Sequence, residues 1–426
     1  MSKILLSNIV DINKSTFKIN NTHKYIYYLD TANITQNVIS NIQKLYPQKD
    51  NIPSRAKRAV SNNTIIYSSV RPNLCHFGIL SNIPSNMVVS TGFITIDVKN
   101  NNIDPYYLFY LITTKEKIDY ITNIANTSVS SYPSITPEIL GNMEIEIIDN
   151  IYEQKRIGTL LKTIDNKIKL NNKINDELEA MAKTIYDYWF LQFEFPNEEG
   201  KPYKSSGGKM VWNEELKREI PEGWKVNNIL NVCDVVDCLH SKKPTYCKEY
   251  EDYYLLTLEN LTEKGYIDLS KKYYISKTDY EKWTSRILVK ENDFVVTNAG
   301  RAGDIGKIPY GVKCAIGRNL TAIRPKNINP YYLRQFFKSN YLKEQVLSNL
   351  DCGSFFMSFN VKSIKSLNVL IPNEDIMKKS IDILKPIILK IENNIVENQE
   401  LTSLRDFLLP LLMNGQVGFK GDKAEG

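Results

Sequence analysis

The chain lacks the features that mark a secreted or membrane protein. No apolar run approaches the roughly 18 residues that a membrane span requires. The N-terminal segment MSKILLSNIVDIN becomes polar too early for a signal peptide. Only 6 Cys and 3 His occur in 426 residues, and no two Cys have the C-x-x-C spacing. We therefore expect a cytoplasmic protein with free thiols. Cys233, Cys238, His240 and Cys247 lie near one another, but without short paired spacings we expect no metal site.

Motifs for nucleotide chemistry are also missing. No G-x-x-x-x-G-K-[ST] loop occurs, and Gly300, Gly303 and Gly306 are spaced evenly by three, unlike G-x-G-x-x-G. Asp104-Pro105-Tyr106-Tyr107 and Asn329-Pro330-Tyr331-Tyr332 are similar to the [DNS]-P-P-[YFW] loop of amino-methyltransferases. Their third residue is Tyr, however, and Asp or Asn followed by Pro is what a helix start requires. We expect no catalytic residue and no bound cofactor in this chain.

Charge and composition are those of an ordinary globular protein. Hydrophobic residues make up 42% and charged residues 24% of the chain, and the net charge is +6. A mild positive excess permits a nucleic-acid partner without requiring one. A chain of 426 residues is long enough for two or more domains.

Two stretches with a heptad rhythm organise the chain. The first places Ile157, Leu161, Ile164, Ile168, Asn171, Asn175, Leu178, Ala182, Ile185 and Trp189 on one seam. The second repeats the rhythm with Leu384, Ile387, Ile391, Asn394, Asn398, Leu401, Arg405, Leu408 and Leu412. Alternating steps of four and three predict coiled-coil helices, and the two Asn occupy the same slots in both.

Other landmarks recur at nearly the same offset. Asp104-Pro105 and Asn329-Pro330 are 225 positions apart, and the strand candidates Met143–Ile148 and Leu367–Pro372 are 224 apart. The sequence therefore predicts a tandem repeat of domain, helix, domain, helix. Both domains are expected to be of the α/β (α+β) class, with strands such as Thr64–Val70, Phe93–Val98 and Phe294–Asn298.

The expected boundaries follow from these landmarks. Domains span residues 1–150 and 221–375, long helices span 151–195 and 376–418, a linker spans 196–220, and a tail spans 419–426. The helix that opens at Asp104 should run to about Asn123. Phe195–Gly208 is rich in Pro, Gly and charge, so neither helix nor strand is expected there. Pro386 should kink the second long helix or delay its start.

Each long helix needs a partner for its apolar seam, and the other copy is the simplest one. Two similar units packed with pseudo-two-fold symmetry would run their helices antiparallel. That arrangement pairs Asn171 with Asn398 and Asn175 with Asn394, and such a buried layer would fix the register of the coiled coil. The alternative is that these Asn are exposed and only reflect an Asn-rich composition.

Several passages resemble the specificity subunit of type I restriction–modification systems. They are IYSSVRP (66–72), EQKRIGTLLKTID (153–165), IYDYWFLQFEFP (185–196), GKPYKSSGGKMVWNEELKREIPEGW (200–224) and GRAGDIGK (300–307). The second helix departs from this pattern, because it opens with Ile376-Met377-Lys378-Lys379-Ser380 instead of EQKRI.

The resemblance implies two target recognition domains, each reading one half of a split site in double-stranded DNA. It implies that the helices set the spacing of the half-sites and dock two adenine-N6 methyltransferase subunits. S-adenosylmethionine would then be bound by the methyltransferase, and ATP and magnesium by restriction subunits that join the complex. Rival hypotheses are a coiled-coil scaffold that holds two protein-interaction modules and a single-chain methyltransferase or nuclease, which the missing motifs disfavour.

Candidate base-reading residues are polar, cationic or aromatic residues of expected loops. In the first domain they are Ser69, Arg71, Asn73, Ser130 and Tyr132. In the second domain they are Arg301, Lys307, Arg318, Asn319, Ser354 and Phe355. The alternative for the cations is a solvated ion pair, and for the aromatic residues a place in the core.

Overall fold

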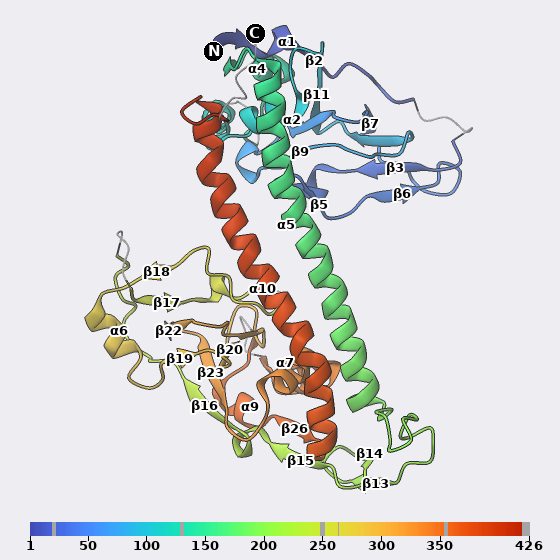
Figure 1. Cartoon of the computed structure of the whole chain (residues 1–426), viewed down its shortest axis with the longest axis vertical. Coiled ribbons are helices and arrows are strands. Elements are labelled where there is room, and N and C mark those ends of the chain that lie inside the picture. Colours follow the sequence, from blue (N-terminus) through green and yellow to red (C-terminus); the bar gives the residue numbers. More distant parts are fainter. Residues whose placement is uncertain (19–22, 128–131, 248–251, 263, 353–356, 420–426) are drawn as a thin grey trace. The chain divides into compact units, whose positions relative to one another are not determined.

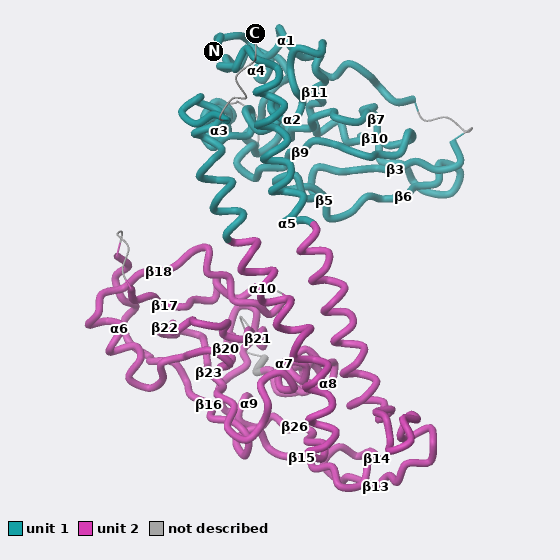
Figure 2. Tube along the Cα trace, viewed as in Figure 1, with its two compact units in different colours: residues 1–169, 400–426 teal, residues 170–399 magenta. Residues whose placement is uncertain are grey.

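The computed structural model describes residues 1–18, 23–127, 132–247, 252–262, 264–352 and 357–419. The chain divides into two compact units (Figure 2). Unit 1 comprises residues 1–169 and 400–426, and unit 2 comprises residues 170–399. Each unit therefore contains one domain and part of both long helices, α5 (Ile151–Tyr186) and α10 (Glu374–Met413).

Unit 1 contains two four-stranded sheets, with strand orders β2-β11-β8-β9 and β6-β3-β10-β7 (Figure 1). The terminal strand β1 pairs antiparallel with β12, which immediately precedes α5. The strands are β1 (Ser2–Leu5), β2 (Val10–Ile12), β3 (Ile26–Leu29), β4 (Ile34–Thr35), β5 (Val38–Ile39), β6 (Gln43–Leu45), β7 (Ala56–Ala59), β8 (Ile65–Ser68), β9 (Phe77–Ile79), β10 (Met87–Ser90), β11 (Phe93–Val98) and β12 (Glu144–Ile147).

The helices of unit 1's domain are α1 (Leu6–Ile9), α2 (Pro105–Ile112), α3 (Lys115–Asn126) and α4 (Pro137–Gly141). The predicted start of α2 is confirmed, because the carboxylate of Asp104 accepts the N–H of Tyr107 at 2.9 Å and Pro105 follows. The prediction of one helix to about Asn123 is wrong. The chain breaks at Thr113 and Thr114, whose hydroxyls donate to carbonyls of the preceding turn, and Thr114 has extended dihedrals.

Unit 2 repeats this plan. Its sheets have the orders β16-β23-β20-β21 and β18-β17-β22-β19, and β15 pairs with β26 as β1 pairs with β12. The strands of its domain are β15 (Lys225–Asn228), β16 (Cys233–Asp237), β17 (Tyr254–Leu256), β18 (Tyr273–Tyr274), β19 (Val289–Lys290), β20 (Phe294–Thr297), β21 (Ile305–Lys307), β22 (Lys313–Ile316), β23 (Leu320–Pro325), β24 (Asp351–Cys352), β25 (Met357–Ser358) and β26 (Asn368–Ile371). The helices are α6 (Lys277–Trp283), α7 (Pro330–Lys338), α8 (Asn340–Ser348) and α9 (Val361–Lys365).

The duplication extends to the direction of the strands. In unit 1, β10 runs parallel to β3 and antiparallel to β7. In unit 2, β22 likewise runs parallel to β17 and antiparallel to β19. Since two unrelated domains would not share both order and direction, the repeat predicted from the sequence offset is a repeat of topology.

The second long helix and the linker each differ from expectation at one point. The expectation that Pro386 delays the second helix is wrong, because α10 already begins at Glu374 and continues through this residue. Because Pro386 has no N–H, the carbonyl of Asp382 lacks its helical hydrogen bond. Both residues are exposed, so solvent can bind that carbonyl instead. The segment predicted as a linker contains a hairpin of β13 (Met210–Asn213) and β14 (Arg218–Pro221).

Helix α5 ends in a π-helical turn, Asp187–Leu191, which carries Trp189 and Phe190 into the core of unit 2. None of the helices in the described part of the chain combines the length and apolar character that crossing a membrane would need.

Candidate functional site

The first candidate loop follows β8 in unit 1 and joins residues that are distant in sequence. The guanidinium of Arg71 lies over the ring of Tyr132, 4.7 Å from its centroid. The backbone N–H of Arg71 donates to the carbonyl of Pro133 at 2.8 Å, which holds the two segments together. Both side chains are exposed. An Arg stacked on an aromatic ring keeps its N–H groups free to reach a base or a phosphate.

Backbone strain marks the same loop. Arg71 and Cys75, which flank the 3-10 turn Pro72–Leu74, both have left-handed dihedrals with φ of 49° and 57°. Non-glycine residues adopt this conformation only where the surroundings impose it, and such residues gather at functional sites. Asn73, within the turn, is exposed. Ser69 is half-buried and its hydroxyl donates to the carbonyl of Gly92 at 2.9 Å. Ser130 lies outside the described residues.

In unit 2, backbone carbonyls hold two of the predicted arginines. Arg318 lies in the turn between β22 and β23, and its Nε donates to the carbonyl of Ser241 at 2.8 Å. Arg301 donates to the carbonyls of Leu258 and Leu261. Its Nε lies 3.2 Å from the carboxylate of Asp304, so it also forms the ion pair that was the alternative for the cations. Both guanidinium groups are therefore positioned by the fold, although both residues remain exposed.

Asn319 follows Arg318 and is also exposed. It has a φ of 63°, and its carbonyl accepts the N–H of Asn298 at 2.8 Å. Asn tolerates this left-handed conformation better than most residues, which suits it to the turn. Ser354 and Phe355 lie outside the described residues.

The structure places Lys307 in the interior, which corrects its assignment as a base-reading residue. Lys307 is 6% exposed, and its ammonium is 2.7 Å from the carboxylate of Glu392 on α10. It also lies 5.3 Å from the ring centroid of Tyr331. Lys307 ends β21, and the pleat of this strand turns its side chain toward the long helix instead of solvent.

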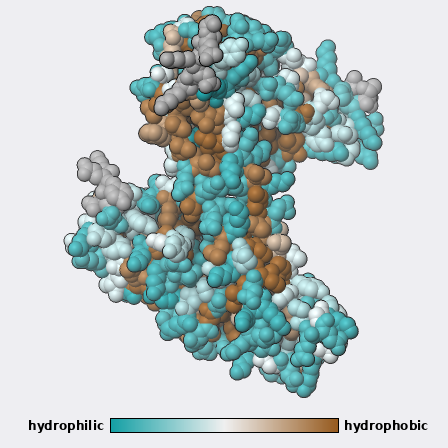
Figure 3. All heavy atoms as spheres, viewed as in Figure 1, coloured by the Kyte–Doolittle hydropathy of each residue, from teal (hydrophilic) through white to brown (hydrophobic). Residues whose placement is uncertain are grey.

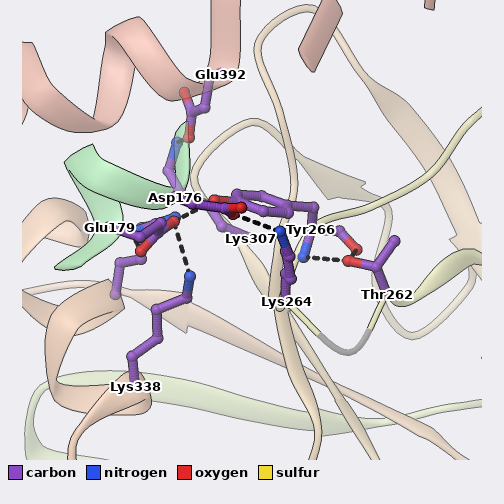
Figure 4. A network of polar contacts seen from close by, with 9 residues as sticks. Asp176, Glu179, Thr262, Lys264, Tyr266, Lys307, Lys338 and Glu392 are labelled. Carbon is purple, nitrogen blue, oxygen red and sulfur yellow. Dashed lines mark hydrogen bonds and ion pairs between the residues drawn. The ribbon is translucent and has the colours of Figure 1, made fainter. Parts of the chain in front are cut away.

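A network of charges around the buried Arg334 attaches the domain of unit 2 to α5 (Figure 4). Glu179 of α5 accepts hydrogen bonds from Arg334 at 2.5 Å and Lys338 at 2.8 Å, both on α7. The hydroxyl of Tyr266 also donates to Glu179, and Lys264 pairs with Asp176 one turn earlier on α5. No pattern in the sequence indicated this network, because its members come from three separate segments without a common spacing.

Burial and charge act in opposite directions within this network. Burial raises the pKa of Glu179, but the charges of Arg334 and Lys338 and their hydrogen bonds outweigh it and lower the pKa to about 2. Burial, followed by repulsion from Arg334, lowers the pKa of Lys338 to about 8 despite the attraction of Glu179. Arg334 is therefore the main partner of Glu179, and Lys338 contributes a cation that the site disfavours.

The two long helices pair antiparallel through an Asn layer in unit 2. The side-chain amide of Asn171 donates to Oδ1 of Asn398 at 2.9 Å, and that of Asn394 donates to Oδ1 of Asn175 at 2.8 Å. These are the two pairs expected from the sequence. Asn171, Asn175 and Asn394 are buried, which excludes the alternative that the seam Asn simply face solvent. Whether the layer sets the register remains a prediction.

The helices are also tied within unit 1. Arg405 of α10 donates to Asp165 of α5 at 2.9 Å, and the other oxygen of that carboxylate accepts the hydroxyl of Tyr110 on α2 at 2.6 Å. Burial, followed by the charge of Asp165, raises the pKa of Tyr110. Arg405 stands at a seam position in the heptad pattern, so the repeat signalled its place but not its partner.

Two residues of the EQKRIG motif dock α5 onto α2. The buried side chain of Gln154 accepts the N–H of Asp104 at 2.9 Å and donates to the carbonyl of Ile148 at 2.7 Å. A Cβ on Gly158 would lie 2.5 Å from the carboxylate of Asp104 and 2.9 Å from the nitrogen of Tyr107. This motif therefore packs the start of α5 against the start of α2, a role that its sequence did not reveal.

The cysteine and histidine residues near β16 form a small group. Ligand atoms of Asp237, Cys238 and His240 lie within 4.8 Å of one another, and His240 is hydrogen-bonded to Asp237 at 2.7 Å. A structural zinc site takes four ligands. In the part of the chain that the structure describes, this group offers three, so it falls short of such a site.

Comparisons with known proteins agree on one family. A family model described as the type I restriction modification DNA specificity domain matches residues 5–180 and 221–403. The type I restriction enzyme HindI specificity subunit of Haemophilus influenzae is 23% identical, over 93% of this chain and 95% of the relative. The MjaIX specificity subunit of Methanocaldococcus jannaschii is 24% identical, over 90% and 86%.

A solved structure has a similar fold. The type I restriction–modification system S subunit from M. genitalium covers 96% of this chain and 95% of its own chain. The TM-score is 0.58 and the sequence identity is 15%. At this identity the likeness concerns the fold and not the residues of the site.

Proposed function

Because the chain belongs to the type I restriction–modification DNA specificity domain family, we propose that it is the DNA sequence-recognition subunit of a type I restriction–modification complex. The observation that carries this proposal is the double match, since residues 5–180 and 221–403 each comprise one domain and most of one long helix. A duplicated reader suits a site made of two half-sites.

We propose that each domain reads one half of a split DNA site. The loops that carry Arg71 and Tyr132 in unit 1, and Arg301, Arg318 and Asn319 in unit 2, are the proposed contact regions. Exposed guanidinium groups that the fold already positions can pair with guanine or with phosphate. Since the loops of the two units differ in sequence, the two half-sites should differ as well.

The helices are proposed to set the spacing between half-sites and to dock two methyltransferase subunits. Apolar side chains exposed on the two helices support a docking role, and Figure 3 shows hydrophobic surface over them in this view. They include Leu170, Met181, Val396, Leu404 and Phe407, which is 66% exposed. In this proposal catalysis belongs to the partners, which supply S-adenosylmethionine for methylation and, in a restriction subunit, ATP and magnesium for cleavage.

Methylation mapping tests the function directly. The chain is expressed with an adenine methyltransferase subunit of a type I system in a host without other adenine methylation. Adenine methylation should appear at a single split, asymmetric sequence, and it should be absent when the chain is left out. Methylation that is independent of the chain, or that follows no sequence, would remove the proposal and favour a scaffold without a role in DNA recognition.

Single arginine variants should affect one half-site each. Arg71→Ala and Arg301→Ala are each expected to weaken binding of the cognate duplex by about 1–3 kcal/mol if the side chain pairs with a guanine. Methylation mapping of each variant should show relaxed specificity in one half-site only. Lys201→Ala, which removes an exposed cation from the segment after α5, is the control for the loss of charge. A variant that binds and methylates as the parent does removes that arginine from the interface.

A further inference from the structure

A cavity of about 240 Å³ lies in the domain of unit 2, beside the candidate reading loops. Its walls come from the segment that carries Lys243 and Tyr246, from β17 and the 3-10 turn Leu258–Asn260, and from β18, the last residue of α6 and the turn after β22. Arg318 lines it directly. Leu258, whose carbonyl accepts a hydrogen bond from Arg301, lines it as well. The cavity therefore adjoins the two arginines of unit 2 that are proposed to contact DNA.

Aromatic residues line this cavity, and two of them carry unpaired polar atoms. Tyr246, Tyr273 and Trp283 contribute to the walls, and the first two rings pack with centroids 4.8 Å apart. Within the described residues, Nε1 of Trp283 and the hydroxyl of Tyr246 are buried without a hydrogen-bond partner. Trp283 is only 1% exposed. Unpaired buried atoms occur elsewhere in the chain, but these two belong to residues that line the same cavity.

A buried donor without a partner destabilises a protein unless something else satisfies it. The indole N–H can only donate, whereas a phenol can donate or accept. A ligand that suits both carries hydrogen-bonding atoms at its edge, and a planar ligand can also stack on the aromatic walls. The cavity is smaller than the roughly 300–1,000 Å³ of drug-sized ligand sites, which favours a single heterocycle.

The charges at the cavity favour an anionic ligand. Glu259 lines the cavity, but its carboxylate is already occupied by Lys271 at 3.0 Å and by the hydroxyl of Tyr273. Lys243 and Arg318 remain as cations at the wall, and the ammonium of Lys243 lies 4.7 Å from the ring centroid of Tyr246. A heterocycle joined to an anion, as in a nucleotide, matches both features.

We propose that this cavity holds one nucleobase of the bound DNA, turned out of the base stack, with its phosphate near Lys243 and Arg318. The inference rests on the proposed function, because it names the nucleotide as part of the DNA that unit 2 reads. Aromatic stacking and hydrogen bonds at the edge of the base would compensate for lost stacking and pairing in the duplex.

The first test uses the full-length chain and small probes. The four deoxynucleoside 5′-monophosphates and deoxyribose 5-phosphate are titrated calorimetrically. At least one monophosphate should bind about tenfold more tightly than deoxyribose 5-phosphate. Trp283→Phe and Tyr246→Phe each remove one polar atom but keep an aromatic ring, and each should weaken that binding about fivefold to tenfold. Trp212→Phe, at an exposed position on β13, should have no effect. The proposal that the cavity binds a base would be wrong if deoxyribose 5-phosphate bound as tightly as the monophosphates. It would also be wrong if both variants bound the monophosphate as tightly as the parent does.

The second test distinguishes a base in DNA from a free nucleotide. A mismatch lowers the energy of unpairing, so a mismatch at one position of the second half-site should tighten DNA binding about tenfold. The same two variants should lose this gain. If monophosphates bind but every mismatch leaves binding unchanged, the cavity takes a free nucleotide and the proposal for DNA is wrong, while the proposed function stands. If no sequence-selective DNA binding exists at all, the proposed function fails, and this inference fails with it, whatever the monophosphates show.

Discussion

Replacing Arg334 with Met is expected to lower the free energy of unfolding of unit 2 by about 3–5 kcal/mol. Arg334 is 3% exposed and is the main partner of Glu179, whose side chain is 19% exposed. Met keeps most of the apolar contacts of the side chain but leaves the carboxylate of Glu179 buried with a weaker partner. Chemical denaturation at pH 7, followed by tryptophan fluorescence, measures the change.

Lys338→Met on the same helix is the matched control. Although Lys338 also contacts Glu179, its lowered pKa of about 8 shows that the site disfavours its charge. We expect this variant to change the free energy of unfolding by less than about 1 kcal/mol. Equal losses in the two variants would show that the two cations share Glu179 evenly, and Arg334 would then not be its main partner.

The two groups should each make stability rise with pH, but in separate pH windows. The folded pKa of Glu179, about 2, is below its ordinary value, so its contribution is present above about pH 4.5 and is lost as the pH falls toward 2. The folded pKa of Lys338 is also lowered, so stability again rises with pH, here from about 8 toward 10.5 as the ammonium loses its proton. Lys338→Met should lose that gain.

The Asn layer should behave as a pair. Asn175→Leu or Asn394→Leu alone is expected to cost about 1–3 kcal/mol, because the remaining amide is left buried without its partner. The double variant should regain the parent stability or exceed it, since two Leu can pack in the seam. Denaturation measures all three, and Asn393→Leu, at an exposed neighbouring position, is the control.

The functional consequence of the double variant is the sharper test. If the layer sets the register of the helices, its removal should permit other registers, and methylation should spread to sites with different spacer lengths. Half-site sequences should stay the same, because the reading loops are untouched. A double variant with unchanged spacer selectivity would show that the apolar contacts alone hold the register.

Features that depend on neighbouring residues or on internal repetition could be predicted from the sequence. The heptads, the strand Phe93–Val98, the caps at Asp104 and Asn329 and the duplication were all readable, because each depends on neighbouring residues or on comparison of the chain with itself. The pairing of Asn175 with Asn394 followed from the duplication, since antiparallel copies bring the middles of the two helices together.

Features formed by contacts between segments that are distant in sequence could not be predicted from the sequence. The burial of Lys307 against Glu392, the network around Glu179 and the cavity beside Trp283 each join residues from separate elements. The break at Thr113 and Thr114 depended on a competition between side chains and backbone that propensity alone does not decide.

The sequence alone thus predicted the duplicated plan and the antiparallel pairing, because repetition and periodicity are properties of a linear chain, and its motifs carried the resemblance to the family. Folding established which cations face solvent and which are consumed in holding a domain to its helix. That difference arises because the energy of a charge depends on what surrounds it in space. In the sequence, Lys307 and Arg318 are both cations of expected loops, and only the fold places Glu392 beside Lys307.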